Sequence, residues 1–255
     1  MPSSPVLGAA EERYVAEALQ HYLQKVGRSS KGGRLAIAES GALGVDASTT
    51  RLGAKSAQAG LVAAAAATGN QISIAQVPQS KSYYCGPAAG FMILKTPKFK
   101  GAKSVADGKA LSQSNLAGSG YMMTDSRGAT TWASKSFVAA LNKWTGANPK
   151  TWYQVNAPTV TRVASIATFN IDLGYAFAVD TVEFQGGTHY NGHPNRTLGH
   201  WLAGYRYSAS GDTLYFADPA ANAPSLTGFG ATKPTFSHAT STFTSRYLQS
   251  NGIVG

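Results

Sequence analysis

A polar loop that runs directly into an apolar helix is the feature that most constrains the fold of this chain. The segment is Gln79-Ser-Lys-Ser-Tyr-Tyr-Cys-Gly-Pro-Ala-Ala-Gly-Phe-Met-Ile-Leu94, and it contains the only cysteine among 255 residues. Proline is favoured in the first turn of a helix, where its missing N–H is not needed, so Pro87 predicts a helix that begins at or next to Cys85. The N–H groups and the dipole at such a helix start favour a thiolate over a thiol.

A lone cysteine is ordinarily a small buried apolar residue, and its partners decide whether it has a chemical role. Here His200 and Asp218 lie far downstream, and a single cysteine with sequence-distant His and Asp partners is typical of a cysteine nucleophile. His200 begins a predicted strand. Asp218 ends the next one, because Pro219 prevents that strand from continuing inside a sheet.

The turn Ala209-Ser-Gly-Asp212 joins these two strands into a predicted hairpin. A modest bulge or stagger in it would make His200 and Asp218 neighbours. Asp218 would then accept a hydrogen bond from one imidazole nitrogen while the other takes the thiol proton of Cys85. Taken separately, the two residues have plainer explanations, as a histidine at a strand end and a turn aspartate before proline.

Acyl transfer also needs hydrogen-bond donors aimed at the developing oxyanion. A glutamine amide upstream of Cys85 would supply one donor, and the Cys85 backbone N–H at the helix start would supply another. Gln79 and Gln76 compete for this role, and the residues alone leave the choice between them open.

The first seventy residues predict a helix followed by a loosely structured tether. Apolar positions in residues 11–26 recur at helical spacing, and residues 27–60 are rich in Gly, Ser, Ala and Lys. Such a segment fits a prosegment that shields an active site until it is cleaved, and equally an extension that packs on the domain or remains free. We therefore divide the chain into an N-terminal extension, residues 1–70, and a catalytic domain, residues 71–255.

The rest of the chain changes from helical to stranded patterning near its middle, which predicts an α+β architecture. Residues 160–170 fit a helix packed on the sheet as well as a strand at 159–164. Beyond the helix after Cys85, we predict helices at 62–67, 104–116, 131–144 and 240–248, a turn at 124–128, and strands at 34–38, 71–77, 151–155, 175–182, 200–207 and 213–217.

Composition limits the partners and the compartment. The net charge is +10, but the basic residues are scattered without a nucleic-acid motif, so we expect no nucleic-acid partner and keep anionic cell-wall polymers as a candidate. One cysteine excludes an intrachain disulfide, and no apolar run approaches the 18 residues of a membrane span. The N-terminus lacks signal-peptide features, so either the protein is not exported this way or the chain begins after a removed signal. The Ser/Thr/Gly-rich composition favours the second, hence a secreted or cell-envelope location. We also expect a monomer.

Four features in order resemble the papain-like cysteine peptidases, and most of all the bacteriocin-processing (double-glycine leader) peptidases and their stand-alone bacterial relatives. They are Gln79, the Cys85-Gly-Pro-Ala helix start, Gly199-His-Trp and Asp218-Pro219, and the resemblance covers about residues 71–220. It implies a papain-like fold in which a helical N-terminal half carries the nucleophile helix and packs on an antiparallel sheet carrying His and Asp. It also implies Cys85 as nucleophile, His200 as base, Asp218 as the residue that orients it, Gln79 rather than Gln76 as oxyanion donor, and no cofactor.

The remaining candidates concern the substrate and a metal. His189 and His193 stand four residues apart, a zinc spacing on a helix, but the Gly, Asn and Pro residues around them favour a loop, and no HExxH glutamate is present, so we expect no metal. The loop 185–196 is predicted to border the active-site cleft. The candidate substrate-binding residues are Tyr84, Gly86, Tyr190, His193 and Trp201.

These observations predict a cysteine peptidase that cleaves a peptide or protein substrate through a thioester acyl-enzyme. A cell-wall amidase or transpeptidase with the same residues is the alternative among enzymes. A non-catalytic papain-like binding module is the alternative outside them, and the intact set of Cys85, His200 and Asp218 counts against it.

Overall fold

The computed structural model describes residues 69–147 and 150–255. The predicted helices at 11–26 and 62–67, the strand at 34–38 and the tether lie outside the described residues. Within the described part of the chain, no helix is both long and apolar enough to cross a membrane.

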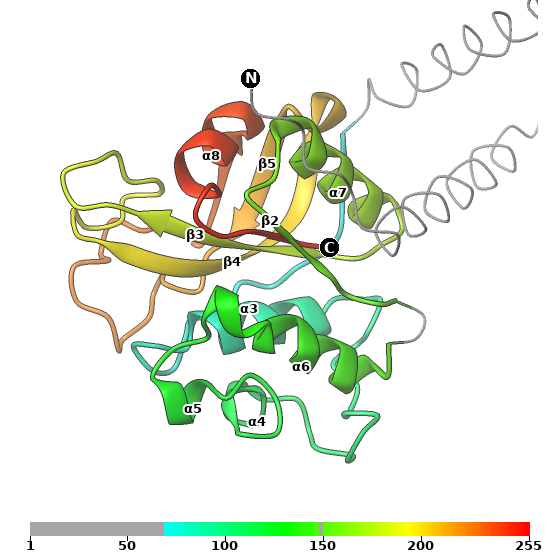
Figure 1. Cartoon of the computed structure of the whole chain (residues 1–255). Helices are drawn as coiled ribbons and strands as arrows, with labels where there is room; N and C mark the ends of the chain where they lie inside the picture. The colour runs from blue at the N-terminus through cyan, green and yellow to red at the C-terminus, as the bar shows by residue number, and fades with distance from the viewer. Residues whose placement is uncertain (1–68, 148–149) are drawn as a thin grey trace, which may run out of the picture. The chain divides into compact units, whose positions relative to one another are not determined.

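An antiparallel sheet forms the centre of the described part (Figure 1). Its strands run in the order β2-β7-β3-β4-β5-β6, and β1 also pairs with β4. The long strands β3 and β4 are central, and β4 pairs with β3 on one side and β5 on the other. The strands are β1 (Asn70–Gln71), β2 (Gln154–Asn156), β3 (Phe177–Glu183), β4 (Leu198–Ser208), β5 (Thr213–Ala217), β6 (Thr235–Ala239) and β7 (Gly252–Val254).

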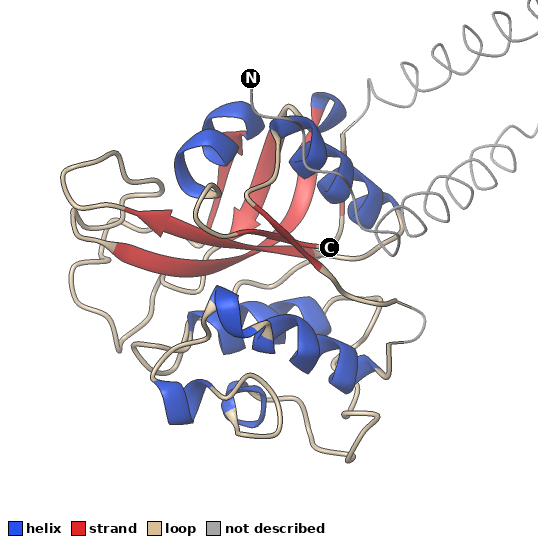
Figure 2. Cartoon of the chain, in the orientation of Figure 1, coloured by secondary structure: helices blue, strands red, loops and turns tan. Residues whose placement is uncertain are grey.

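Helices cover both faces of this sheet (Figure 2). One layer contains α3 (Cys85–Leu94), α4 (Gln113–Ala117), α5 (Thr124–Arg127), the 3-10 turn η1 (Trp132–Ser134) and α6 (Ser136–Thr145). The other contains α7 (Val160–Asp172) and α8 (Thr240–Tyr247). A second 3-10 turn, η2 (Ala209–Gly211), joins β4 to β5.

Strand alternation divides the apolar side chains between two cores. On β4, Trp201 and Ala203 pack with residues of α3 and α6, whereas Leu202 between them packs with residues of α7 and α8. The predicted α+β architecture, with the Cys85 helix packed on an antiparallel sheet, is confirmed. The layer of α7 and α8 on the opposite face of the sheet was not part of the predicted architecture.

The hairpin that carries the two candidate partners of Cys85 has the predicted bulge. Ala203 of β4 lies opposite Ala217 of β5, and the register shifts between Gly204 and Arg206. Asp218, one residue beyond Ala217, therefore lies near the beginning of β4. The close packing at Gly204 explains that glycine, because a Cβ there would overlap the ring of Phe177.

Of the two alternatives for residues 160–170, the structure has the helix α7, and Thr159 caps its start by accepting a hydrogen bond from Arg162 N. Three predicted elements differ from the structure. The turn predicted at 124–128 contains the short helix α5. The helix predicted at 104–116 is wrong except for residues 113–116, because Gly108 at φ +69° turns the chain and Ser104 N bonds back to Lys109 O. The strand predicted at 71–77 is reduced to Gln71, and β6 and β7 were not predicted.

Candidate active site

Cys85 is the first residue of α3, and Tyr84 is the N-cap residue. Because the first N–H groups of a helix have no partner within it, the start of α3 presents donors and a positive dipole end next to the half-buried thiol. The following Gly86 is buried, and a Cβ there would overlap the side chain of Thr130. Gly86 thus lets the start of α3 approach the chain at Thr130, which is a packing role rather than the predicted contact with substrate.

His200 lies near the start of β4 and Asp218 directly follows β5. The His200 Nε2 is 2.9 Å from Asp218 Oδ1, and both side chains are almost completely buried. His200 also interacts with Cys85. Because Nε2 is engaged by Asp218, Nδ1 is the imidazole nitrogen left for the thiol.

Asp218 is surrounded by donors at both carboxylate oxygens. Besides His200, its Oδ1 accepts from Ala220 N at 2.9 Å. Its Oδ2 accepts from Asn191 Nδ2 at 2.8 Å and lies 2.9 Å from His193 Nε2. Such a saturated carboxylate has a fixed orientation.

Electrostatics favour the charged forms of both residues despite their burial. Burial opposes protonation of His200, but the Asp218 carboxylate and the hydrogen bonds to Asp218 and Cys85 outweigh it and raise the pKa of His200 to about 10. Burial also opposes ionisation of Asp218, yet His200 and the hydrogen bond from His193 hold the pKa of Asp218 below its usual range. The two groups therefore form an imidazolium–carboxylate pair at neutral pH.

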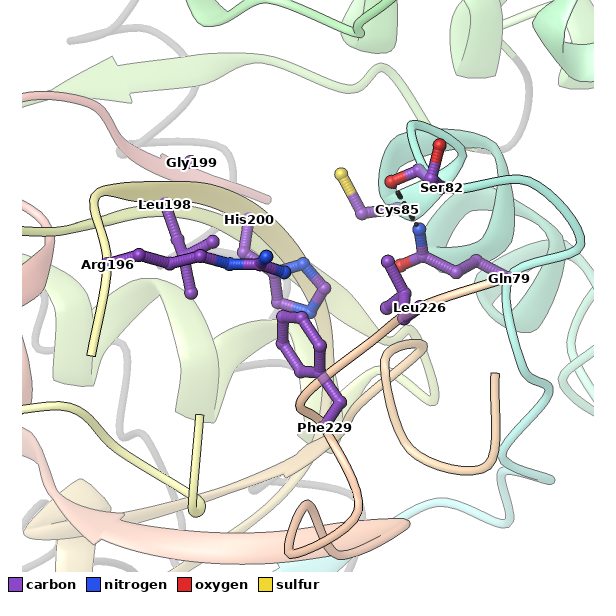
Figure 3. A pocket seen from close by; sticks show the side chains of 9 residues that line it. All are labelled: Gln79, Ser82, Cys85, Arg196, Leu198, Gly199, His200, Leu226 and Phe229. Carbon is purple, nitrogen blue, oxygen red and sulfur yellow. Dashed lines mark hydrogen bonds between the residues drawn. The ribbon is translucent and has the colours of Figure 1, made fainter. Parts of the chain in front are cut away.

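A pocket is lined by both Cys85 and His200 (Figure 3). Cys85 and Gln79 come from the segment that leads into and begins α3, and His200 comes from β4. Apolar side chains and one cation complete much of the wall. The lining residues are Gln79, Ser82, Cys85, Arg196, Leu198, Gly199, His200, Leu226 and Phe229.

The structure distinguishes the two competing glutamines. Gln76 lies outside the pocket lining, and its Nε2 donates to the backbone oxygens of Asp218 and Ala221. Gln79 lines the pocket, but its Nε2 donates to the oxygens of Lys81 at 2.9 Å and Ser82 at 3.0 Å, and its buried Oε1 has no hydrogen-bond partner. Gln79 thus lines the pocket as expected, whereas its amide nitrogen is occupied by these two backbone oxygens.

Three of the predicted substrate-binding side chains lie in the core instead. Tyr84 is fully buried and donates to Asp125 Oδ1 at 2.7 Å. Strand alternation turns Trp201 away from His200, so that its ring stacks on Phe137 at 4.0 Å. Tyr190 is enclosed by aromatic rings of the second core, and its hydroxyl bonds to Thr181. None of the three lines the pocket.

His193 is also buried, and neither of its ring nitrogens faces the pocket. Nε2 contacts Asp218 Oδ2, and Nδ1 lies 2.7 Å from Glu183 Oε2. The loop 185–196 does border the pocket, but through Arg196. Glu183 and Asn191 were missed from the sequence. The Asn191-Gly192 pair, with φ values of +50° and +72°, was the one local sign that a tight turn presents His193.

The cluster of His193, His200 and Asp218 is also the group of described residues that could hold a metal ion. Ligand atoms of His193, His200 and Asp218 lie within 4.8 Å of one another, whereas His189 does not belong to the group. Both imidazoles place Nε2 at 2.9 Å from an oxygen of Asp218, which is hydrogen-bond geometry. A cation would have to separate these pairs, so the donor set is explained without one.

A cysteine at the start of a helix, facing a histidine and an aspartate on an antiparallel sheet, is the arrangement of a papain-like cysteine peptidase. The chain belongs to the Peptidase_C39 like family, whose model matches residues 70–249. Among solved structures, the chain is similar to xylellain, a cysteine protease from Xylella fastidiosa, with 11% identity and a TM-score of 0.38 over 76% of this chain and 87% of that one. No curated protein sequence matches the chain. The protein is therefore a cysteine peptidase, with a protein or peptide as substrate.

Proposed function

We propose that the protein hydrolyses peptide bonds through a thioester acyl-enzyme, with Cys85 as nucleophile, His200 as general base and acid, and Asp218 as the group that orients His200. The observation that carries this proposal is the dual engagement of one imidazole. His200 bonds to Asp218 through Nε2 and interacts with Cys85 in the same pocket.

In the first half of the reaction, the Cys85 thiolate attacks the carbonyl carbon of the scissile bond. The His200 imidazolium then gives its proton to the leaving amine as the C–N bond breaks, and a thioester remains on Cys85. In the second half, neutral His200 takes a proton from water as the water oxygen attacks the thioester. The C–S bond breaks, the product leaves as a carboxylic acid that loses its proton to solvent, and the thiolate–imidazolium pair is restored.

The oxyanion formed in each half requires donors near Sγ. The Cys85 N–H at the start of α3 is one candidate. Gln79 is the second, on condition that its amide releases one of the carbonyl oxygens of Lys81 and Ser82 and turns toward the pocket. The unpartnered Oε1 supports this mobility, because turning the amide sacrifices no acceptor contact.

Labelling by a peptide aldehyde tests the nucleophile. Cys85 in the folded protein should react far faster than in a urea-denatured control, and Cys85→Ala should abolish both labelling and peptide turnover. Equal labelling of folded and denatured Cys85 would contradict an activated thiol. Turnover that survives in Cys85→Ala would exclude the acyl-enzyme.

A second candidate function is amide cleavage or transpeptidation on cell-wall fragments by the same three residues. The net charge of +10 favours it, because anionic wall polymers would be attracted to the protein. It accords with the secreted or cell-envelope location predicted from the sequence. Turnover of a peptide library compared with that of purified wall fragments, at low and high salt, separates the two candidates.

A further inference from the structure

A second carboxylate–imidazole pair extends the row that begins at Cys85. Glu183, the last residue of β3, lies 2.7 Å from His193 Nδ1 through Oε2, and His193 Nε2 lies 2.9 Å from Asp218 Oδ2. Asp218 then reaches His200 through its other oxygen at 2.9 Å. The end of β3, the β3–β4 loop, the residue after β5 and the strand β4 therefore supply an alternating row of Glu183, His193, Asp218 and His200 that ends at the thiol.

The side chains of Glu183, His193 and Asp218 are fully buried. A neutral imidazole has only one N–H, whereas His193 has a carboxylate oxygen within hydrogen-bond distance of each nitrogen. The group of Glu183, His193 and Asp218 must therefore hold one proton more than a neutral imidazole between two carboxylates. Burial opposes a charge on His193, but the hydrogen bonds to Asp218 and Glu183 outweigh burial and raise the pKa of His193. The charged groups facing this ring are Glu183, Asp218 and His200.

The loop between β3 and β4 is built to hold His193 in this place. Asn191 and Gly192 adopt left-handed conformations, and a Cβ on Gly192 would lie 2.8 Å from Ala231 O. Asn191 bridges Asp218 Oδ2 and Lys233 O. Glu183 Oε1 accepts from Tyr190 N at 2.8 Å, and the Phe229 ring, which lines the pocket, packs edge-on against His193.

We propose that Glu183 and His193 are positioning residues that hold Asp218 Oδ2, so that Oδ1 stays aligned with His200 and the thiolate–imidazolium pair is maintained. The proposal rests on the proposed function of Cys85, His200 and Asp218. Neither residue lines the pocket, so their loss should lower kcat and leave KM nearly unchanged.

Two substitutions of His193 separate positioning from packing. His193→Gln places an amide donor where Nε2 was and keeps the bond to Asp218, whereas His193→Asn places it near Nδ1 and keeps only the bond to Glu183. The readout needs no substrate: the rate of Cys85 alkylation by iodoacetamide at pH 6, divided by the rate at pH 9.5 in the same variant. A change in access to the thiol alters both rates equally and leaves the ratio unchanged. The ratio therefore reports how much of Cys85 is held as a thiolate by the His200 imidazolium at pH 6.

We expect the ratio and kcat to fall about tenfold to a hundredfold in His193→Asn, and to stay within about threefold of wild type in His193→Gln. His189→Gln is the control, because His189 lies in the same loop, 3.6 Å from Glu183, and outside the Asp218 cluster. Equal losses in the Gln and Asn variants, or no loss in either, would overturn the proposal.

A second pair of substitutions, at Glu183, tests the proposal if near-ultraviolet circular dichroism shows that His193→Asn is unfolded. Glu183→Gln can donate to His193 Nδ1 and accept from Tyr190 N, so the ratio should stay within about threefold, whereas Glu183→Met should lose about tenfold or more. Equal ratios in this pair would overturn the proposal. A wild-type protein that alkylates no faster than its denatured form at pH 6 would instead refute the proposed function.

Discussion

Burial by itself would neutralise the ionisable residues around Cys85, because moving a charge out of water is costly. His200 and Asp218 remain charged since each compensates the other at 2.9 Å and further donors saturate the carboxylate. The ion pair between His200 and Asp218 therefore exists only in the folded chain. The protonation of these two residues should accordingly affect the free energy of unfolding.

The pH dependence of stability tests this at His200. Its pKa is raised in the folded protein to about 10, from an ordinary value of 6.5, so its stabilising contribution is complete below pH 6.5 and is lost as the pH rises to about 10. The free energy of unfolding in urea should exceed that of His200→Gln most at pH 6, and most of this excess should disappear by pH 10. A difference that does not vary between pH 6 and 10 would show that the pair carries no net linkage.

Gly86 provides a second prediction at the scale of one residue. In Gly86→Ala, the new methyl group would overlap the side chain of Thr130, so we expect a loss of about 1 to 3 kcal/mol and a lower Tm, despite the better helix propensity of alanine. Gly199→Ala is the control for stability, because nothing lies within 4 Å of its Cβ position and its stability should change by less than about 0.5 kcal/mol. Equal Tm values for Gly86→Ala and wild type would show that α3 can move away from Thr130.

At the scale of elements, the docking of α7 involves a buried cation. Lys150 Nζ donates to Asn170 Oδ1 of α7 at 2.5 Å and lies 4.6 Å from the ring of Trp152 and 5.2 Å from that of Tyr175. Among the described residues, the groups in contact with this ammonium are an amide oxygen and aromatic faces, and no carboxylate forms an ion pair with it. Burial therefore lowers the pKa of Lys150 to about 7.

The sign of this linkage is opposite to that of His200. Between pH 7 and the ordinary lysine pKa of 10.5, the unfolded chain binds a proton at Lys150 that the folded chain does not, so Lys150 makes the free energy of unfolding rise with pH. Relative to wild type, Lys150→Met should be most stable below pH 7 and should lose roughly 2 to 4 kcal/mol of that advantage by pH 10. Urea denaturation from pH 6 to 10 measures the free energy of unfolding of both proteins. A difference between them that does not change with pH would contradict a lowered pKa of Lys150 in the folded protein.

The sequence predicts elements well where local chemistry dominates. Pro87 marks the start of α3, and the Ala209–Asp212 turn with Pro219 defines the β4–β5 hairpin. It fails where tertiary contacts decide: β6 and β7 are short and exist through pairing with β5 and β3, and the 104–112 segment is held by turns. The grouping of Cys85, His200 and Asp218 could be predicted from the motifs and the hairpin. Glu183 and Asn191 could not, because their contacts with His193 and Asp218 depend on the folded path of the β3–β4 loop.

At the scale of the whole described domain, the site lies between a helical layer and the sheet. Cys85 belongs to α3, whose apolar residues form one core, while His200 and Asp218 belong to the hairpin that both cores hold in place. Because the three residues come from different layers, their spacing depends on the packing of α3 against β4. The family match begins at residue 70, and the sequence preceding it is the predicted extension.

If this extension is a prosegment rather than a retained segment, we predict that the protein removes it itself. After incubation, mass spectrometry of the full chain should show cleavage within residues 27–76 in wild type and an intact N-terminus in Cys85→Ala, because only the former can form the acyl-enzyme. Addition of a trace of wild type to Cys85→Ala distinguishes cleavage between molecules from cleavage within one. If both proteins keep their N-termini under conditions in which wild type is labelled by a peptide aldehyde, the extension is not a self-processed prosegment.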